Sequence, residues 1–153
     1  PSRRIAYLSK LSGPIMDRID IQLWLSPVDP GKLVERQASE SSAEVAARVQ
    51  HARKLQRQRF ELENASLPKD KRIFCNAAMS NRQIEKYCPL SKECKELLQR
   101  IINHMGLSAR ACNRIIKLAR TIADLSGVAD IQPMHLSEAA SYRFLDKQNI
   151  FEM

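Results

Sequence analysis

Helix caps and helix-ending glycines constrain the fold of this chain more than any other feature. From residue 79 onward, four segments carry apolar side chains at helical spacing, and each opens with a capping residue or a proline. We expect helices over about 80–87, 91–104, 108–125 and 133–145. Short amphipathic helices joined by brief loops are typical of a compact bundle. The sequence therefore predicts a mainly α fold.

The expected helix ends rest on capping chemistry. Ser80 and Gln83 form a capping box, in which two side chains satisfy the first free N–H groups of a helix. Ser108 is placed to cap the third helix. Gly106 and Gly127 each follow a helical segment, where a residue with left-handed backbone commonly ends the helix.

A strongly basic helix is expected over residues 42–62, opened by a second capping box from Ser41 to Glu44. Its stretch 48–59 contains no acidic residue. The basic residues are Arg48, Arg53, Lys54, Arg57 and Arg59. The thin apolar seam is Val45, Val49 and Ala52. The stretch could bind a phosphate backbone, or it could be a solvated face whose long side chains cover apolar surface. Phe60 is the one nearby aromatic residue for base stacking.

Residues 19–25 read as a β-strand without a partner. Apolar and polar residues alternate over this stretch, and the apolar set is expected on a buried face. The apolar set is Ile19, Ile21, Leu23 and Leu25. No later segment reads convincingly as a second strand, and a lone strand leaves its backbone groups unpaired. We therefore expect the rest of the sheet to lie elsewhere and the chain to be a piece of a larger protein.

The charge of the chain suits a phosphate-bearing partner. It carries 25 basic and 17 acidic residues, for a net charge of +8, and such a balance attracts nucleotides or nucleic acid. The alternative is a solvated basic surface without a specific partner. The apolar runs are too short to cross a bilayer and no leader opens the chain. We expect a cytoplasmic protein without a membrane partner.

Several kinds of site are missing from the sequence. The four cysteines and three histidines show no zinc-ligand spacing, so we expect reduced thiols and no metal site. None of the four glycines begins a phosphate-cradling P-loop, and no strand ends in the Asp-Glu pair that would hold magnesium. We therefore expect that this chain alone neither hydrolyses ATP nor binds it tightly.

Four blocks of the sequence nevertheless resemble one specific family. They are YLSKLSGPIMDRID at 7–20, ESSAE at 40–44, GLSARA at 106–111 and RTIADL at 120–125. In order and approximate spacing, these blocks are similar to the C-terminal part of the magnesium-chelatase-like AAA+ ATPases of the ComM/YifB type. The resemblance covers nearly the whole chain.

The resemblance implies a role for two arginines. In the family, the arginine of the Gly-Pro-Leu-Leu-Asp-Arg-Ile-Asp block is the finger that reaches into the neighbouring subunit of a ring. This implies that Arg18 is the catalytic finger, with Ile15 and Met16 in place of the two leucines. The helix that opens Ser-Ala-Arg-Ala supplies the sensor-2 arginine, which contacts the nucleotide of its own subunit. That role falls on Arg110, and Cys112 stands where the family often has an aromatic residue.

The resemblance also bears on the domain organisation of the chain and on the cofactors and partners of the intact protein. It implies an ATPase-core remnant of helix, turn and last strand at 1–26 and a helical lid at 79–145. The residue pattern itself indicates a linker at 27–41, the basic helix at 42–62, an exposed connection at 63–78 and a tail at 146–153. ATP and Mg²⁺ would be cofactors of the intact protein, with none bound by this piece. The intact protein would be a homo-oligomeric ring that couples ATP hydrolysis to remodelling of DNA, since ComM-type members are associated with branch migration in natural transformation. The chelatase relatives instead work on a porphyrin.

Two alternatives remain open on the sequence alone. One is a stand-alone nucleic-acid-binding module of helix-turn-helix type, whose second helix would need polar base-reading side chains on its exposed face. The candidates are Arg110, Asn113, Arg114, Lys117 and Arg120. The other is a protein-interaction scaffold, which fits a helical bundle but leaves Arg18 and the strand unexplained.

Overall fold

The computed structural model describes residues 18–23, 25, 27, 31 and 40–143. Its elements in chain order are the helices and 3-10 turns α4 (Ser42–Ala65), η1 (Lys69–Lys71), η2 (Asn76–Ala78), α5 (Asn81–Tyr87), α6 (Lys92–Met105), α7 (Ala109–Leu125) and α8 (Pro133–Ser141). The prediction of a mainly α fold is confirmed. No helix in this described part is both long and apolar enough to cross a lipid bilayer.

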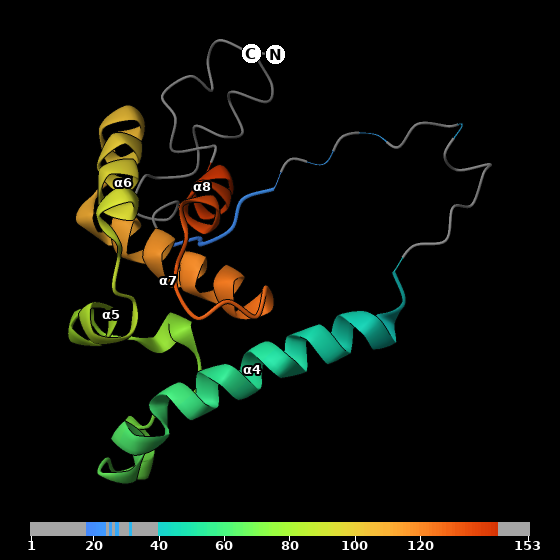
Figure 1. Cartoon of the computed structure of the whole chain (residues 1–153), viewed down its shortest axis with the longest axis vertical. Helices are drawn as coiled ribbons and strands as arrows, with labels where there is room; N and C mark the ends of the chain where they lie inside the picture. Colours follow the sequence, from blue (N-terminus) through green and yellow to red (C-terminus); the bar gives the residue numbers. More distant parts are fainter. Residues whose placement is uncertain (1–17, 24, 26, 28–30, 32–39, 144–153) are drawn as a thin grey trace.

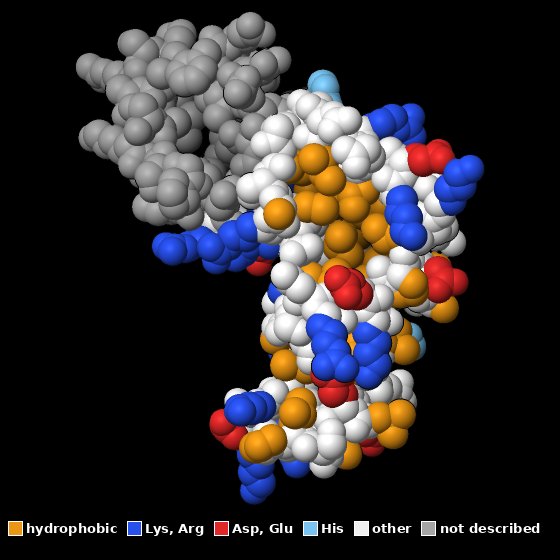
Figure 2. Space-filling model, turned by 90° about the vertical axis from the view of Figure 1, so that its left-hand side faces the viewer, with side chains coloured by type: hydrophobic (Ala, Val, Ile, Leu, Met, Phe, Trp, Pro, Cys, Tyr) orange, Lys and Arg blue, Asp and Glu red, His pale blue; other side chains and the backbone are white. Residues whose placement is uncertain are grey.

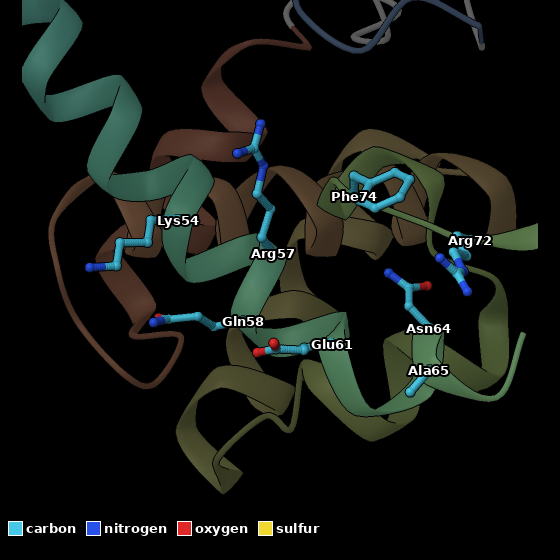
Figure 3. Close-up of a pocket in the computed structure, with 8 residues that line it drawn as sticks. All are labelled: Lys54, Arg57, Gln58, Glu61, Asn64, Ala65, Arg72 and Phe74. Atoms are coloured by element: carbon cyan, nitrogen blue, oxygen red, sulfur yellow. The ribbon is translucent and has the colours of Figure 1, made fainter. Parts of the chain in front are cut away.

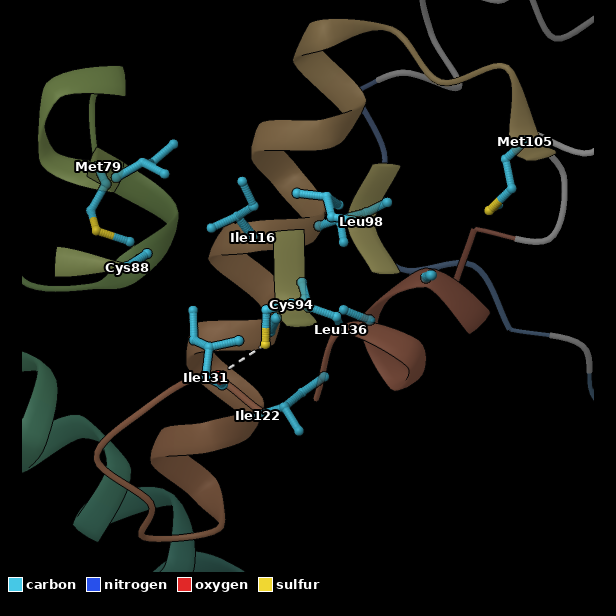
Figure 4. Close-up of a cluster of buried hydrophobic side chains, with 14 of the residues drawn as sticks. Met79, Cys88, Cys94, Leu98, Met105, Ile116, Ile122, Ile131 and Leu136 are labelled. Carbon is cyan, nitrogen blue, oxygen red and sulfur yellow. Dashed lines mark hydrogen bonds between the residues drawn. The ribbon is translucent and has the colours of Figure 1, made fainter. Parts of the chain in front are cut away.

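The bundle is built around α7, which contacts α4, η2, α5 and α8, while α8 also packs on α6 (Figure 1). Buried apolar side chains from all of these helices form one continuous core (Figure 4). Ile115 of α7 and Leu136 of α8 are almost fully enclosed in it. The Cys94 thiol donates to the Ile131 carbonyl oxygen at 3.3 Å and so fixes α6 to the loop before α8. Seen from the α6 side, hydrophobic side chains also gather on the surface of the bundle, with Lys and Arg side chains beside them (Figure 2).

The predicted caps are confirmed. Ser41 Oγ accepts from the Glu44 N–H at 3.3 Å, while the Glu44 carboxylate accepts from the Ser41 N–H at 2.8 Å. The second capping box, at the start of α5, has the same reciprocal pair. Gly106 ends α6 with φ of 62° and Gly127 follows α7 with φ of 68°, a region that glycine adopts without strain.

α4 is longer than predicted and packs through a different stripe. Its buried residues are Ala52, Gln56, Phe60 and Asn64. They lie four positions apart, which places them on one face of the helix. Val45 and Val49, predicted for the apolar seam, are 38% and 41% exposed, because the first half of α4 extends beyond the bundle (Figure 1). The predicted seam is therefore wrong except at Ala52.

The predicted strand over 19–25 is not observed in the described residues of that stretch, which have no regular secondary structure. Its expected buried face is also reversed: Ile21 and Leu23 are 49% and 64% exposed, whereas Gln22 is 6% exposed. The Gln22 N–H donates to the Tyr142 carbonyl oxygen at 2.7 Å, so the segment docks on the end of α8 through backbone groups. A strand needs a paired neighbour to satisfy both of its edges, and no strand is present in the described chain. The rest of the predicted core remnant, at 1–17, lies outside the described residues.

The segment 63–78, predicted as an exposed connection, departs from that prediction at two residues. Asn64 and Asn76 are 8% and 1% exposed. The Asn76 N–H donates to Gln56 Oε1 at 3.2 Å, and its Nδ2 donates to the Asp124 carboxylate at 2.8 Å. An asparagine amide that satisfies several buried polar groups belongs to the interior. The predicted last helix also ends at Ser141 rather than near residue 145.

All four cysteines are free thiols, as predicted. Cys88, the residue that ends α5, is buried, and burial raises the pKa of its thiol to about 11. Cys75 is exposed. Among the described residues, no group of three or more His, Cys, Asp or Glu side chains is arranged to hold a metal ion.

We expect the stability of the bundle to fall as the pH drops through the range in which histidine titrates. His135 is 2% exposed, and its Nδ1 accepts from the Gln132 backbone N–H at 3.1 Å. Burial, with a smaller contribution from Arg120, lowers the pKa of His135 below the ordinary 6.5, while Glu138 acts in the opposite direction. A lowered pKa means that the unfolded chain binds the proton first, so stability is complete above the ordinary value and decreases below it. Urea unfolding between about pH 7.5 and 5.5 should show a loss of at most about 1.4 kcal/mol per pH unit.

His135→Gln is the matched control for this effect, because glutamine keeps an acceptor for the Gln132 N–H and does not titrate. The variant should show a flat stability in the same pH range. An equal slope in both proteins would contradict the assignment. The lowered pKa of Glu63 does not interfere, because carboxylates lose stability only at more acidic pH.

Candidate functional site

Arg110 lies in the first turn of α7, and its side chain is exposed. Ser108 caps this turn by accepting from the Ala111 N–H at 3.2 Å. The first N–H groups of a helix point outward and give its start a partial positive charge. A guanidinium beside a helix N-terminus suits a phosphate group. The turn belongs to α7, the helix that contacts α4, η2, α5 and α8.

Arg18 lies on the segment that docks on α7 and α8, and it is exposed as well. The backbone carbonyl groups of Arg18 and Ile19 are held in place by two arginines of the bundle. The Arg114 Nη1 donates to the Arg18 carbonyl oxygen at 2.8 Å, and the same guanidinium forms an ion pair with Asp20. The Arg143 Nη1 donates to the Ile19 carbonyl oxygen at 3.1 Å. The Arg18 side chain is thus presented at the surface from an anchored backbone.

The docked segment and α7 enclose a small pocket beside this anchor, lined by Asp20, Arg114 and Lys117 among others. Lys117 donates to the Ala77 carbonyl oxygen at 3.0 Å. Burial lowers the pKa of Lys117, the nearby Arg114 guanidinium lowers it further, and Asp20 raises it. The charged side chains that line this pocket already form hydrogen bonds or ion pairs within the chain. We therefore interpret the pocket as part of the contact between the docked segment and α7.

Arg114 follows Arg110 by one helical turn, so the two side chains start from the same face of α7. The structure therefore brings the backbone of Arg18 onto the helix that carries Arg110. Both side chains are exposed, and the roles of Arg18 and Arg110 stay predictions.

The helix-turn-helix alternative loses most of its proposed base-reading residues. Arg120 is 3% exposed, and it donates to the carbonyl oxygens of Val128 and Ala129 at 2.8 and 2.6 Å. Asn113 donates to the Asn81 side chain at 3.0 Å. Arg114 and Lys117 are engaged as described above. The prediction of Arg120 as an exposed reader is wrong, because its position on α7 faces the interior.

A buried charge network, which the sequence pattern did not predict, joins α4 to α7. The Asp124 side chain is 1% exposed and forms ion pairs with Arg59 of α4 and Arg120 of α7. Asn76 of η2 donates to the same carboxylate. One signal was present in the sequence: Arg120 and Asp124 are four positions apart in a predicted helix, a spacing at which oppositely charged side chains can pair.

Comparison with known proteins agrees with this architecture. Residues 39–143 match the family model described as magnesium chelatase, subunit ChlI C-terminal. The chain is 39% identical over 151 residues to protein YifB of Salmonella typhimurium, a match that covers 96% of this chain and 27% of that protein. It is 35% identical over 144 residues to competence protein ComM of Haemophilus influenzae, covering 94% of this chain and 26% of that protein. The chain thus spans about a quarter of the length of these relatives.

Proposed function

The chain belongs to the magnesium chelatase ChlI C-terminal family and corresponds to the C-terminal part of a ComM/YifB-type protein, and from this premise we propose that it is the lid of a ring-forming AAA+ ATPase. In this proposal Arg110 senses the nucleotide of its own subunit. Arg18 acts as the finger toward the neighbouring subunit. The observation that carries the proposal is the exposed position of Arg110 in the first turn of the central helix α7.

Arginine suits both proposed roles for a chemical reason. Phosphoryl transfer develops negative charge on the outer phosphate oxygens, and a planar guanidinium with several donors stabilises that charge. Arg110 and the N-terminal amides of α7 offer donors of the right kind for a nucleotide phosphate. The phosphate cradle and the magnesium ligands would come from parts of the intact protein outside this chain, because no P-loop occurs in its sequence.

The lid would transmit hydrolysis through α7. Arg110 lies at one end of α7 and Asp124 at the other, where the buried network holds α4. A change in what Arg110 contacts would therefore move α4 together with α7. We propose DNA as the substrate that this motion remodels, on the strength of the net charge of +8 and the similarity to competence protein ComM.

Replacing Arg110 by alanine in the full-length protein that carries this chain tests the sensor role. We expect the dissociation constant for ATP to rise by about tenfold or more, because a charge-assisted hydrogen bond to phosphate is lost. Titration of a P-loop-intact, hydrolysis-deficient protein with a fluorescent ATP analogue measures this change. Arg100→Ala, at an exposed arginine of α6, is the matched control and should bind ATP normally. Equal affinities for all three proteins would defeat the proposed role of Arg110.

A further inference from the structure

An open groove lies between the second half of α4 and the segment that follows η1 (Figure 3). Its charged lining consists of Lys54, Arg57 and Arg72 with a single carboxylate, Glu61. The aromatic ring of Phe74 closes one side. The groove is far in sequence from Arg18 and Arg110, and the roles proposed for those residues do not use it.

Phe74 is unusual because it is a large aromatic side chain left 59% exposed. Phe60, the aromatic residue expected to be available for stacking, is fully buried and packs edge-on against Tyr87 with ring centroids 5.3 Å apart. The prediction that Phe60 could stack on a base is therefore wrong. Phe74 offers the exposed ring in its place, beside the same basic helix.

The backbone next to the Phe74 ring is fixed. Asn64 Nδ2 donates to the Ile73 carbonyl oxygen at 2.6 Å, and the Ile73 N–H donates to Asn64 Oδ1 at 3.0 Å. The Arg72 Nε donates to the Leu67 carbonyl oxygen at 3.1 Å. A ring held on an anchored backbone loses little conformational entropy when it binds a flat partner.

The terminal nitrogens of the three basic residues that line the groove are available for a partner, whereas other basic residues of α4 are engaged. Arg48 and Arg59, near the two ends of the basic stretch, form ion pairs with Glu40 and Asp124. In the described part of the chain no ion pair engages Lys54, Arg57 or Arg72. Three cations against one carboxylate leave the groove electropositive, which suits an anionic backbone.

We propose that this groove binds single-stranded DNA, with one base stacked on Phe74 and the phosphates contacted by Lys54, Arg57 and Arg72. Basic side chains that follow a backbone, combined with an aromatic platform, are how proteins hold single strands without sequence preference. A duplex keeps its base faces stacked on one another and would leave the Phe74 ring unused. The choice of DNA as the nucleic acid rests on the proposed function, whereas the single-stranded form follows from the exposed ring.

Fluorescence anisotropy with a labelled oligo-dT and the 153-residue chain tests the proposal. Phe74→Ala should weaken binding by roughly fivefold to a hundredfold, the range for loss of one base–aromatic contact. Phe74→Trp should retain binding, and its tryptophan fluorescence should be quenched when DNA is added. The parent chain, whose single tryptophan is Trp24, provides the reference for that signal. Thermal melting of each variant confirms that the fold is intact.

The salt dependence separates the charged contacts from the stacking contact. Three phosphate contacts to a single strand predict a slope of log K against log salt of about −2. Arg57→Ala should reduce this slope, and Phe74→Ala should leave it unchanged. Arg100→Ala removes the same charge from α6 and should change neither slope nor affinity. Leu62→Ala, at a 90% exposed position of α4 outside the groove, is the apolar control.

Three results would overturn the groove as a single-strand site. The first is a DNA affinity that Phe74→Ala leaves unchanged. The second is an equal loss of DNA affinity from Arg57→Ala and Arg100→Ala. The third is tighter binding of a duplex than of a single strand, with no effect of Phe74→Ala on the duplex. The proposed nucleotide roles fail separately, in the ATP-binding and ATPase measurements on Arg110 and Arg18 variants. If DNA affinity depends on Phe74 while the Arg18 and Arg110 variants bind and hydrolyse ATP normally, the groove is supported and the nucleotide roles are rejected.

Discussion

Asp124→Asn should destabilise the bundle by about 3–5 kcal/mol, the cost of removing one partner from a buried ion pair. The Asp124 carboxylate faces Arg59 Nη1 at 2.8 Å and Arg120 Nε at 3.1 Å, and it also accepts from Asn76. Asparagine keeps the shape but removes the charge, which leaves the 3% exposed Arg120 guanidinium without a counter-ion. A loss of this size is a large part of the total stability of a small domain. Urea denaturation followed by circular dichroism measures it.

Asp130→Asn is the matched control for this experiment. Asp130 is exposed in the loop before α8, and the same change there should alter the free energy of unfolding by less than about 0.5 kcal/mol. A small effect of Asp124→Asn would mean that the buried carboxylate does not hold α4 and α7 together. Arg59→Met should weaken the contact between α4 and α7 and should be non-additive with Asp124→Asn, because both substitutions remove the same interaction.

The local features of the fold could be predicted from the sequence, because they depend on neighbouring residues. Ser41 and Glu44, and likewise Ser80 and Gln83, interact across three positions, so the capping boxes are legible in the sequence. The two glycines that end α6 and α7 are legible for the same reason. These signals were sufficient to predict the bundle.

The contacts between distant segments could not be predicted in this way. Arg59 and Asp124 are 65 positions apart, and a single sequence carries no signal that pairs them. The stripe on which α4 packs depends on how far α4 overlaps α7, so Val45 and Val49 were placed in the seam although they lie beyond the overlap. Phe74 was overlooked because a lone aromatic residue in a loop has no periodicity.

The strand prediction for segment 19–25 failed for a further physical reason. Alternation predicts a strand only when a neighbouring strand completes the pairing, and no such strand occurs in the part of the chain that the structure describes. Without it, the backbone of Ile19 and Gln22 bonds to residues at the end of α8. Arg18 and Arg110 are a different case, because their roles were predicted from the family resemblance and not from a physical pattern. The structure adds that both residues are exposed, that Arg110 lies on α7, and that Arg114 of α7 bonds to the backbone of Arg18.

In the full-length protein, Arg18→Ala should lower the rate of ATP hydrolysis by on the order of a thousandfold or more, the effect of a missing finger arginine. Ground-state binding of ATP should change little, since the finger acts on charge that develops during transfer. This separates Arg18 from Arg110, whose loss should weaken binding itself. Asp20→Asn, which weakens the ion pair with Arg114 and leaves the Arg18 side chain in place, serves as a nearby control and should have a smaller effect on the rate.

Mixed rings decide whether Arg18 acts across the subunit interface. Subunits with Arg18→Ala are combined with subunits disabled in the P-loop, each inactive alone. Some interfaces of the mixed rings then pair an intact nucleotide pocket with an intact Arg18 from the neighbour, so ATP hydrolysis should partly return. The same mixture made with Arg110→Ala should not regain activity if Arg110 acts within its own subunit, because no mixed interface then combines an intact pocket with an intact sensor. Mixed rings that demonstrably form but stay inactive with Arg18→Ala would rule out a finger acting in trans.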